Sequence, residues 1–221
     1  MKLEEVCDDL FGLILDYLNL ENINNFLDSS FELKNYKNYF YCIILDKNDS
    51  KKYYLDEDYR KEIDNELKQR LVKKLSLVLS GCNNITDVSA LCKVHTLILE
   101  FCNNITDVSG LGKVHNLILC RCENISDVSA LGNVHTLILQ DCINIEDVGA
   151  LCNVHTLTFG SCKNISDVSA LCNVHNLTLK YCNNITDVSA LGNVHNLTIY
   201  RCENIRDVSA LCNVHNLTIC W

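Results

Sequence analysis

The carboxy-terminal two thirds of the chain repeat one unit of 20 residues, from about Leu75 to Trp221. Each copy restates the pattern of residues 94–113, in which apolar side chains return to the same slots. A fixed period of this length predicts a solenoid, because one short unit stacks on copies of itself and the copies share one continuous core. The copies are nearly identical, so the few positions that differ indicate where a binding surface would lie.

Two leucines in each copy alternate with outward positions, as Leu97 and Leu99 do, and this period of two is typical of a β-strand. The repeat predicts eight such strands side by side in one parallel sheet, about 4.8 Å apart. Asp107 and Ser109 follow where side-chain oxygens can cap a single helical or 3-10 turn. We therefore expect an α/β solenoid over residues 75–221, with the parallel sheet on its concave side and short turns on its convex side.

The spacing of the apolar slots resembles the leucine-rich repeat. From Val94 to Asp107 it reads Val-x-x-Leu-x-Leu-x-x-Cys-x-x-Ile-Thr-Asp. The cysteine slot followed by Ile-Thr-Asp is similar to the cysteine-containing subtype, and the short Asp-Val-Ser-Ala-Leu return resembles the compact repeats of internalin-like proteins. The resemblance covers about residues 72–221.

Seven of the 15 cysteines occupy one slot of the repeat. Thiols stacked about 4.8 Å apart and pointing the same way have a poor geometry for disulfides. A buried thiol instead behaves as a small hydrophobic group. We expect a reduced protein of the cytoplasm, or of the host cytoplasm if the chain is viral. The slot contains Cys82, Cys102, Cys122, Cys142, Cys162, Cys182 and Cys202.

The charge and the motif content exclude several classes of function. The net charge of −9 without a basic stripe disfavours nucleic acid as a partner. No apolar run approaches the roughly 20 residues that cross a bilayer, so we expect no membrane partner. There is no glycine-rich phosphate loop and no G-x-S-x-G motif, so we expect no enzyme activity and no cofactor.

The two slots after the second strand leucine vary most between copies. The alternation places the first of each pair on the concave face and the second at the strand end. Free drift of exposed positions would explain the variation, but not the enrichment in aromatic and arginine residues, which anchor protein interfaces. We predict that this face binds a target protein. Its residues are Glu100, Phe101, Arg121, Gln140, Asp141, Lys180, Tyr181, Tyr200 and Arg201.

All seven histidines share another slot. Imidazoles stacked about 4.8 Å apart could bind a transition metal, or they could form a half-exposed row that was repeated with the rest of the unit. No acidic ligand shares the slot, and we favour the second interpretation. Protonation of close imidazoles is unfavourable, so we expect acid to destabilise the array. The row consists of His95, His115, His135, His155, His175, His195 and His215.

The amino-terminal residues carry apolar side chains at helical spacing. The stretch Ile14-Leu15-Asp16-Tyr17-Leu18 resembles the core of an F-box, although Val6-Cys7 stands where an F-box usually has Leu-Pro. F-boxes followed by cysteine-type repeats form a known architecture, and the chain is similar to such proteins of large DNA viruses and protists. The resemblance implies that residues 1–45 are a small all-α module of a substrate-recognition subunit of an SCF-type ubiquitin ligase. It would dock to a Skp-type adaptor through Leu10, Leu13, Ile14, Tyr17 and Leu18.

An alternative is that these helices only cap a repeat-based binding module that has no link to ubiquitin. Residues 46–74 would connect the two parts. A charged stretch at 46–52 precedes an expected helix at 56–74, whose Ile63, Leu67 and Leu71 share one face and cover the first strand edge. The last predicted strand ends at Trp221 with nothing to cover it, so we expect either that a natural partner covers this edge or that the protein self-associates there.

Overall fold

The computed structural model describes residues 42–69 and 74–221. Of these, residues 43–69 and 74–221 belong to one compact unit. The five residues that the sequence assigns to adaptor docking lie outside the described residues, as does Leu71.

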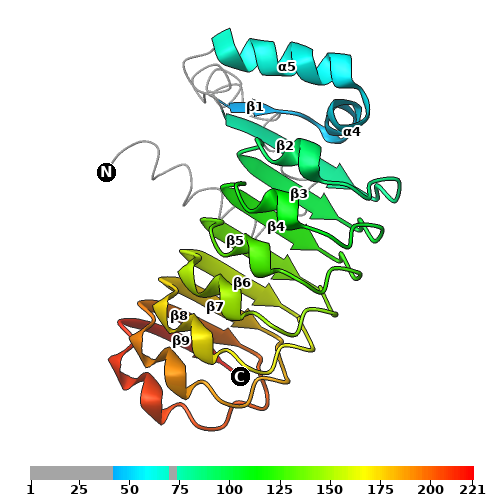
Figure 1. The fold of residues 1–221 in the computed structure, drawn as a ribbon. Coiled ribbons are helices and arrows are strands. Elements are labelled where there is room, and N and C mark those ends of the chain that lie inside the picture. The colour runs from blue at the N-terminus through cyan, green and yellow to red at the C-terminus, as the bar shows by residue number, and fades with distance from the viewer. Residues whose placement is uncertain (1–41, 70–73) are drawn as a thin grey trace, which may run out of the picture. The chain divides into compact units, whose positions relative to one another are not determined.

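The described chain forms one open sheet of nine strands, ordered as they occur in the sequence (Figure 1). The eight repeat strands are parallel, and each residue pairs with the residue 20 positions later, as Leu97 pairs with Leu117. This confirms the predicted strands and their register. A short strand that was not predicted, β1 (Cys42–Ile44), precedes them at one edge. The repeat strands are β2 (Lys74–Ser80), β3 (Thr96–Glu100), β4 (Asn116–Cys120), β5 (Thr136–Gln140), β6 (Thr156–Gly160), β7 (Asn176–Lys180), β8 (Asn196–Tyr200) and β9 (Asn216–Cys220).

A 3-10 helix lies between each pair of repeat strands, as the sequence predicts (Figure 1). An aspartate precedes each one, and its carboxylate accepts a hydrogen bond from the backbone N–H two residues later. In the second copy, Ser109 N donates to Asp107 Oδ1 at 2.8 Å. These turns are η1 (Ser89–Leu91), η2 (Ser109–Leu111), η3 (Ser129–Leu131), η4 (Gly149–Asn153), η5 (Ser169–Asn173), η6 (Ser189–Asn193) and η7 (Ser209–Asn213).

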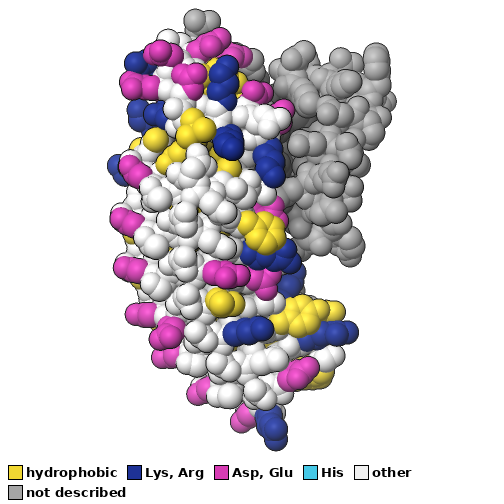
Figure 2. Space-filling model, turned by 90° about the vertical axis from the view of Figure 1, so that its right-hand side faces the viewer, with side chains coloured by type: hydrophobic (Ala, Val, Ile, Leu, Met, Phe, Trp, Pro, Cys, Tyr) yellow, Lys and Arg dark blue, Asp and Glu magenta, His cyan; other side chains and the backbone are white. Residues whose placement is uncertain are grey.

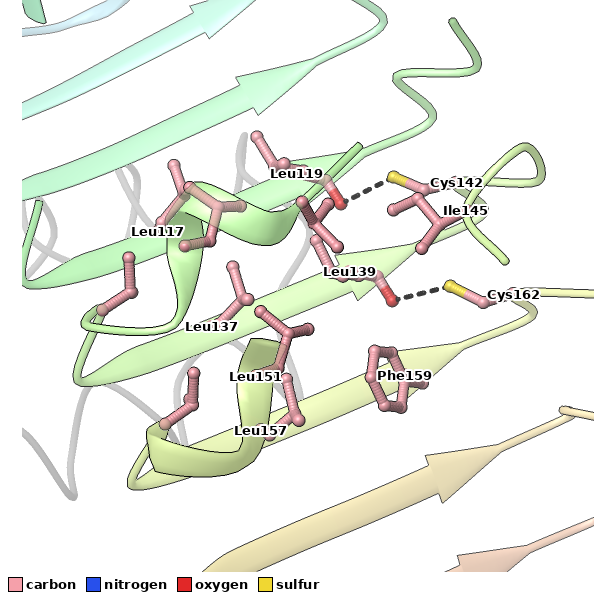
Figure 3. Packing of buried hydrophobic residues seen from close by; sticks show 14 of the residues in the cluster. Leu117, Leu119, Leu137, Leu139, Cys142, Ile145, Leu151, Leu157, Phe159 and Cys162 are labelled. Atoms are coloured by element: carbon pink, nitrogen blue, oxygen red, sulfur yellow. Dashed lines mark hydrogen bonds between the residues drawn. The ribbon is translucent and has the colours of Figure 1, made fainter. Parts of the chain in front are cut away.

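The core lies between the sheet and the 3-10 turns and runs through all the copies (Figure 3). In the middle of the array, Leu137 of β5, Ile145 and Leu151 are all fully buried. Phe159 takes the slot that Leu139 fills in the preceding copy, and it is also fully buried. Because equivalent residues repeat in every copy, no single repeat has a core of its own.

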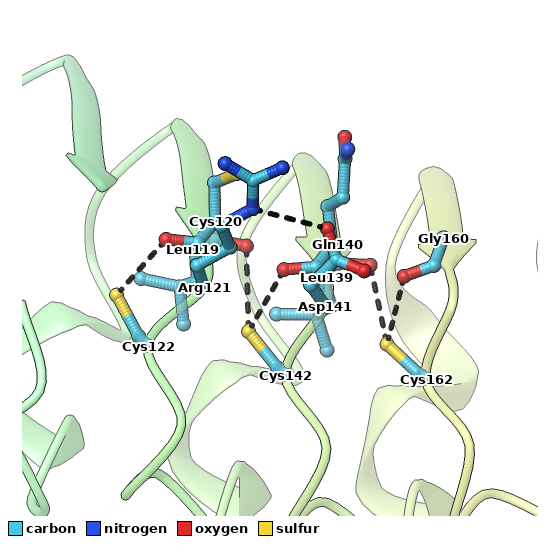
Figure 4. A network of polar contacts seen from close by, with 10 residues as sticks. All are labelled: Leu119, Cys120, Arg121, Cys122, Leu139, Gln140, Asp141, Cys142, Gly160 and Cys162. Atoms are coloured by element: carbon cyan, nitrogen blue, oxygen red, sulfur yellow. Dashed lines mark hydrogen bonds and ion pairs between the residues drawn. The ribbon is translucent and has the colours of Figure 1, made fainter. Parts of the chain in front are cut away.

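The slot of buried cysteines ties each copy to the one before it (Figure 4). The Cys142 thiol donates to the carbonyl of Leu119 at 3.4 Å, and the Cys162 thiol donates to that of Leu139 at 3.3 Å. Burial raises the pKa of Cys142 to about 12 and that of Cys162 to about 11. These thiols therefore stay protonated at neutral pH and remain hydrogen-bond donors.

Asparagine amides make a second set of bonds between copies, on the loops after the strands. Asn144 Nδ2 donates to the backbone carbonyl of Glu123 at 2.8 Å, and Asn204 Nδ2 donates to that of Asn183 at 2.7 Å. Like the thiols, these amides donate to backbone carbonyls of the preceding copy.

Two helices precede the repeats: α4 (Lys47–Leu55) and α5 (Glu57–Gln69). The sequence predicts a helix at 56–74 after a charged stretch at 46–52, and the structure places a further helix, α4, over that stretch. The reason is local, because Asp46 Oδ1 accepts hydrogen bonds from the N–H groups of Asn48 and Asp49 and caps a helix there. At its other end, α5 gives way to β2, which begins at Lys74.

Helix α4 packs against β2, and α5 packs against α4 (Figure 1). Ser50 of α4 is fully buried at this contact. Its hydroxyl donates to the carbonyl of Leu45 at 3.1 Å and accepts from the N–H of Val78 at 3.0 Å. The first strand edge is therefore covered by β1 and α4. The later helix contributes as well, since Ile63 of α5 is buried in the same core and Leu67 packs against it.

The sheet edge at β9 has no strand beyond it among the described residues. Leu217 is 39 % exposed there, whereas Leu197 in the same slot of β8 is 1 % exposed. Self-association through this edge stays a prediction, which sedimentation velocity over a range of protein concentrations would test.

Candidate functional site

The residue that follows each of the strands β2 to β8 has a left-handed backbone. Gly81 takes this conformation with φ of 64°, and six residues that are not glycine take it with φ between 49° and 55°. The N–H of each residue still pairs with the next copy, as Tyr181 N does with Tyr200 O at 2.9 Å. The six residues are Phe101, Arg121, Asp141, Ser161, Tyr181 and Arg201.

This conformation is unfavourable for a residue with a side chain, because its Cβ lies too close to the following carbonyl oxygen. The cost is about 1–2 kcal/mol per residue. Glycine has no Cβ and avoids this contact. It occupies the equivalent position at Gly81, so a glycine is compatible with this turn. Six copies nevertheless carry a side chain there. Each of these side chains directly follows the last residue of its strand.

We call the nine predicted target-binding residues the strand-end strip. Five of them are the left-handed residues other than Ser161, and the remaining four are the last residues of their strands: Glu100, Gln140, Lys180 and Tyr200. The structure brings all nine to the same edge of the sheet. Figure 2 looks onto the strand ends and shows hydrophobic and basic side chains gathered there.

The first half of the strip is a linked group of three side chains. The guanidinium of Arg121 lies 4.9 Å from the ring centre of Phe101, within the range of a cation–π contact. Arg121 Nε also lies 3.5 Å from Asp141 Oδ2 (Figure 4). Phe101 is 40 % exposed, so its ring is available as an apolar anchor.

The second half is a second group of three. The rings of Tyr181 and Tyr200 meet edge to face with centres 5.4 Å apart. A hydrogen bond from the Tyr181 hydroxyl to Tyr200 raises the pKa of Tyr181. The Arg201 guanidinium lies 5.6 Å from the ring centre of Tyr200. Tyr181 is 44 % exposed.

Small residues separate the two halves. Gly160 and Ser161 occupy the two strip slots of β6 and its turn. A Cβ added to Gly160 would lie 3.4 Å from Cγ of Gln140, which is ordinary contact, so the side chain of Gln140 lies over the backbone of Gly160. The strip therefore consists of two groups of large side chains that are separated by two small residues.

Sequence reasoning missed Ile143 beside the strip. This residue follows Cys142 in a slot that is polar in the other copies, and it is 37 % exposed. The slot normally forms bonds between copies, as when Asn103 Oδ1 accepts the N–H of Glu123 at 3.1 Å. A single apolar residue in a polar slot was the signal that could have revealed it.

The histidines form a continuous stack, with adjacent ring centres 4.6–4.8 Å apart. The Nδ1 atoms of His115 and His155 lie 3.0 and 3.2 Å from polar side-chain oxygens of the next residue. Desolvation and the neighbouring His175 lower the pKa of His155, and the same causes, together with His215, lower that of His195. The predicted spacing is confirmed.

Other kinds of site find little support in the described part of the chain. No group of three or more His, Cys, Asp or Glu side chains within residues 42–69 and 74–221 is arranged to hold a metal ion. None of the helices described is long and apolar enough to span a bilayer. An open pocket on the turn side is lined by Glu146, Asp147, Gly149, Asp167 and Ala170, and it has no aromatic anchor.

The left-handed backbone predicts that the side chains of the strip lower the stability of the folded protein. Replacing Tyr181 by Gly should stabilise the protein relative to Tyr181→Ala by about 1 kcal/mol, because only glycine relieves the left-handed backbone. Both variants remove the same aromatic ring. Urea unfolding of the pair measures the difference, and equal stabilities would show that the backbone is not strained there.

No family model matches the sequence, and neither does any curated protein. Among solved structures, an internalin from Listeria monocytogenes is similar over 74 % of this chain, with a TM-score of 0.50 and 24 % sequence identity. The chain covers 56 % of the length of that internalin chain. This likeness, with the parallel strands and the repeated 3-10 turns, identifies the fold as the predicted leucine-rich-repeat solenoid.

Proposed function

We propose that this chain is a protein-binding protein whose strand-end strip holds a target protein. One observation carries the proposal: six copies keep a side chain in a backbone conformation where glycine would be more stable. Backbone strain that persists in a structure is often linked to function. Aromatic and arginine residues, which supply most of the binding energy in protein interfaces, occupy four of the six positions.

The form of the strip favours a protein over a small molecule. Small ligands bind in concave pockets that bury most of their surface. The strip is instead an extended row along the strand ends, and it contains aromatic and arginine side chains, which are enriched in the surfaces that proteins use to bind one another. The pocket described above lies on the turn side and does not include the strip.

Site-specific photocrosslinking tests this proposal. A photoreactive residue at position 181 should crosslink to a partner protein in extracts of the source cell, and the product should disappear when Phe101 and Arg201 are replaced by Gly. The control places the same group at Ser129, an exposed residue of η3 on the turn side. Products of equal yield from both positions, or products that the strip variants leave unchanged, would contradict the proposal.

We further propose that the target is recruited for ubiquitin transfer, with the amino-terminal residues docking to a Skp-type adaptor. The support comes from the sequence, where Ile14-Leu15-Asp16-Tyr17-Leu18 resembles the F-box core. The alternative, a scaffold whose amino-terminal helices act only as a cap, is less favoured because β1 and α4 already cover the edge of β2. Capping the solenoid therefore does not require residues 10–18.

Pull-down with a purified Skp-type adaptor separates these two readings. The full chain should bind the adaptor, and the double variant Tyr17→Asp, Leu18→Asp should not. Circular dichroism should show that the repeats of the variant remain folded, and Phe101→Gly serves as a control that leaves adaptor binding intact. No binding by the full chain would leave the scaffold without a ubiquitin link as the function.

A further inference from the structure

The two halves of the strand-end strip differ in charge. The first half contains Glu100 and Asp141 against one cation, Arg121, which already contacts Asp141. The second half contains Lys180 and Arg201, and none of the strip residues there is acidic. The whole chain, by contrast, carries a net charge of −9.

The turn residues next to the second half leave this balance unchanged. Lys163 and Glu203 are both exposed and have opposite charges. The N–H of Glu203 is held by Asn183 Oδ1 at 3.1 Å, which keeps this residue in the loop after Cys202. With both included, the second half keeps a net charge of +2, and the first half, with Glu123 added, has −2.

The chemistry of the second half is that of hydrogen-bond donors. A guanidinium has five N–H donors in a fork that matches a carboxylate, and an ammonium group has three. The hydroxyl of Tyr200, which accepts from Tyr181, can donate as well. The edge-to-face tyrosine pair also fixes the platform on which Arg201 lies. Such a cluster fits an anionic group next to an apolar one.

We infer that the second half of the strip binds an acidic segment of the target, with Asp or Glu carboxylates meeting Arg201 and Lys180. This inference depends on the proposed function of the strip and adds the chemical class of its partner. The negative charge of the first half determines which half of the strip the acidic segment occupies, because a segment placed on the first half would face Glu100 and Asp141. Complementary charge of this kind also raises the rate of association and makes it sensitive to salt.

A peptide array tests the inference. Short peptides share one apolar framework with a tyrosine and a leucine, and their variable positions carry Glu, Lys, Gln or phosphoserine. The wild-type protein should bind the Glu peptides at least about tenfold more strongly than the Lys peptides at low salt. Lys180→Glu combined with Arg201→Glu should abolish or reverse this preference. Lys93→Glu combined with Lys113→Glu, at two exposed residues outside the strip, is the matched control and should leave it unchanged.

The outcomes separate this inference from the proposed function. If peptides of all charges bind equally and Tyr181→Gly abolishes their binding, the strip is a protein-binding site and the acidic partner is wrong. If phosphoserine peptides bind and Glu peptides do not, the carboxylate assignment is also wrong. If no peptide binds in a way that depends on Tyr181, Lys180 or Arg201, both the inference and the proposed function fail.

Discussion

Replacing Leu137 by Ala is expected to lower the free energy of unfolding by about 2–5 kcal/mol, the usual range for a fully buried leucine. Leu137 lies in the middle of the array, where it pairs with Leu117 on one side and Leu157 on the other. Truncation of this side chain leaves a cavity in a core that both neighbouring copies share. A solenoid has no second core that could compensate for the loss of packing. Urea unfolding followed by circular dichroism measures the effect.

The chain supplies a control with the same chemistry. Leu217 fills the same slot in β9, but it pairs with a single neighbour, Leu197, and is 39 % exposed. Leu217→Ala should cost less than about 1 kcal/mol, in the range of substitutions away from a packed core. Equal effects of the two substitutions would mean that the copies do not share one core, and this would overturn the account of the fold.

The repeat pattern was sufficient to predict the strands, their register and the interior of the array. The physical reason is that strand period, core slots and turn residues all recur together, so each copy confirms the assignment made for the others. The cysteine slot illustrates this. Seven thiols in one register could not be a disulfide framework, and Cys142 and Cys162 are found buried and bonded to carbonyls of the preceding copy.

The left-handed backbone of the strand ends could not be predicted, although the sequence shows that these positions vary between copies. Glycine is the usual sequence signal for such a backbone, and it occurs at Gly81 alone among the seven positions. Phe101 and Tyr181 are residue types typical of strands, so the sequence indicates extended backbone there. The conformation is imposed by the stack, because the N–H of each residue pairs with the neighbouring copy while the chain turns toward the core.

The cap before the repeats was predicted less well, because it occurs once and nothing in the chain repeats it. Helix α4 is strongly polar, and its buried side chains, Ser50 and Tyr53, are too few to give a helical pattern. The Asp46 cap was the only local signal. A buried serine that satisfies the backbone on both sides becomes evident only when the partner strand is known.

Acid is expected to destabilise the solenoid well before its carboxylates titrate. The folded pKa values of His155 and His195 lie below the ordinary value of 6.5, because of desolvation and then the neighbouring imidazoles. The unfolded chain therefore binds more protons than the folded chain once the pH falls below about 6.5, and stability falls with it. Thermal unfolding at about pH 7.5 and about pH 5.5, at one ionic strength, should show a lower Tm at the acidic pH.

The aspartate row titrates in a separate range. Hydrogen bonds from the backbone and hydroxyl of Ser109 and Ser129 lower the pKa values of Asp107 and Asp127 below 3.8. The stability that these carboxylates contribute is present above pH 3.8 and is lost only as the pH falls through their lowered pKa values. A change in stability between pH 7.5 and 5.5 therefore comes from the histidines and not from these aspartates.

A variant with His155→Gln and His195→Gln identifies the source of the acid effect. Glutamine cannot take up a proton, and the two substitutions leave His175 and His215 without a neighbouring imidazole. His95, His115 and His135 remain stacked on one another. The variant should lose less stability than the wild type between the two pH values, while the two proteins respond alike below pH 4, where the aspartates titrate. A wild-type Tm that does not change between pH 7.5 and 5.5 would contradict the prediction, since stacked imidazoles that accept protons freely cannot repel one another.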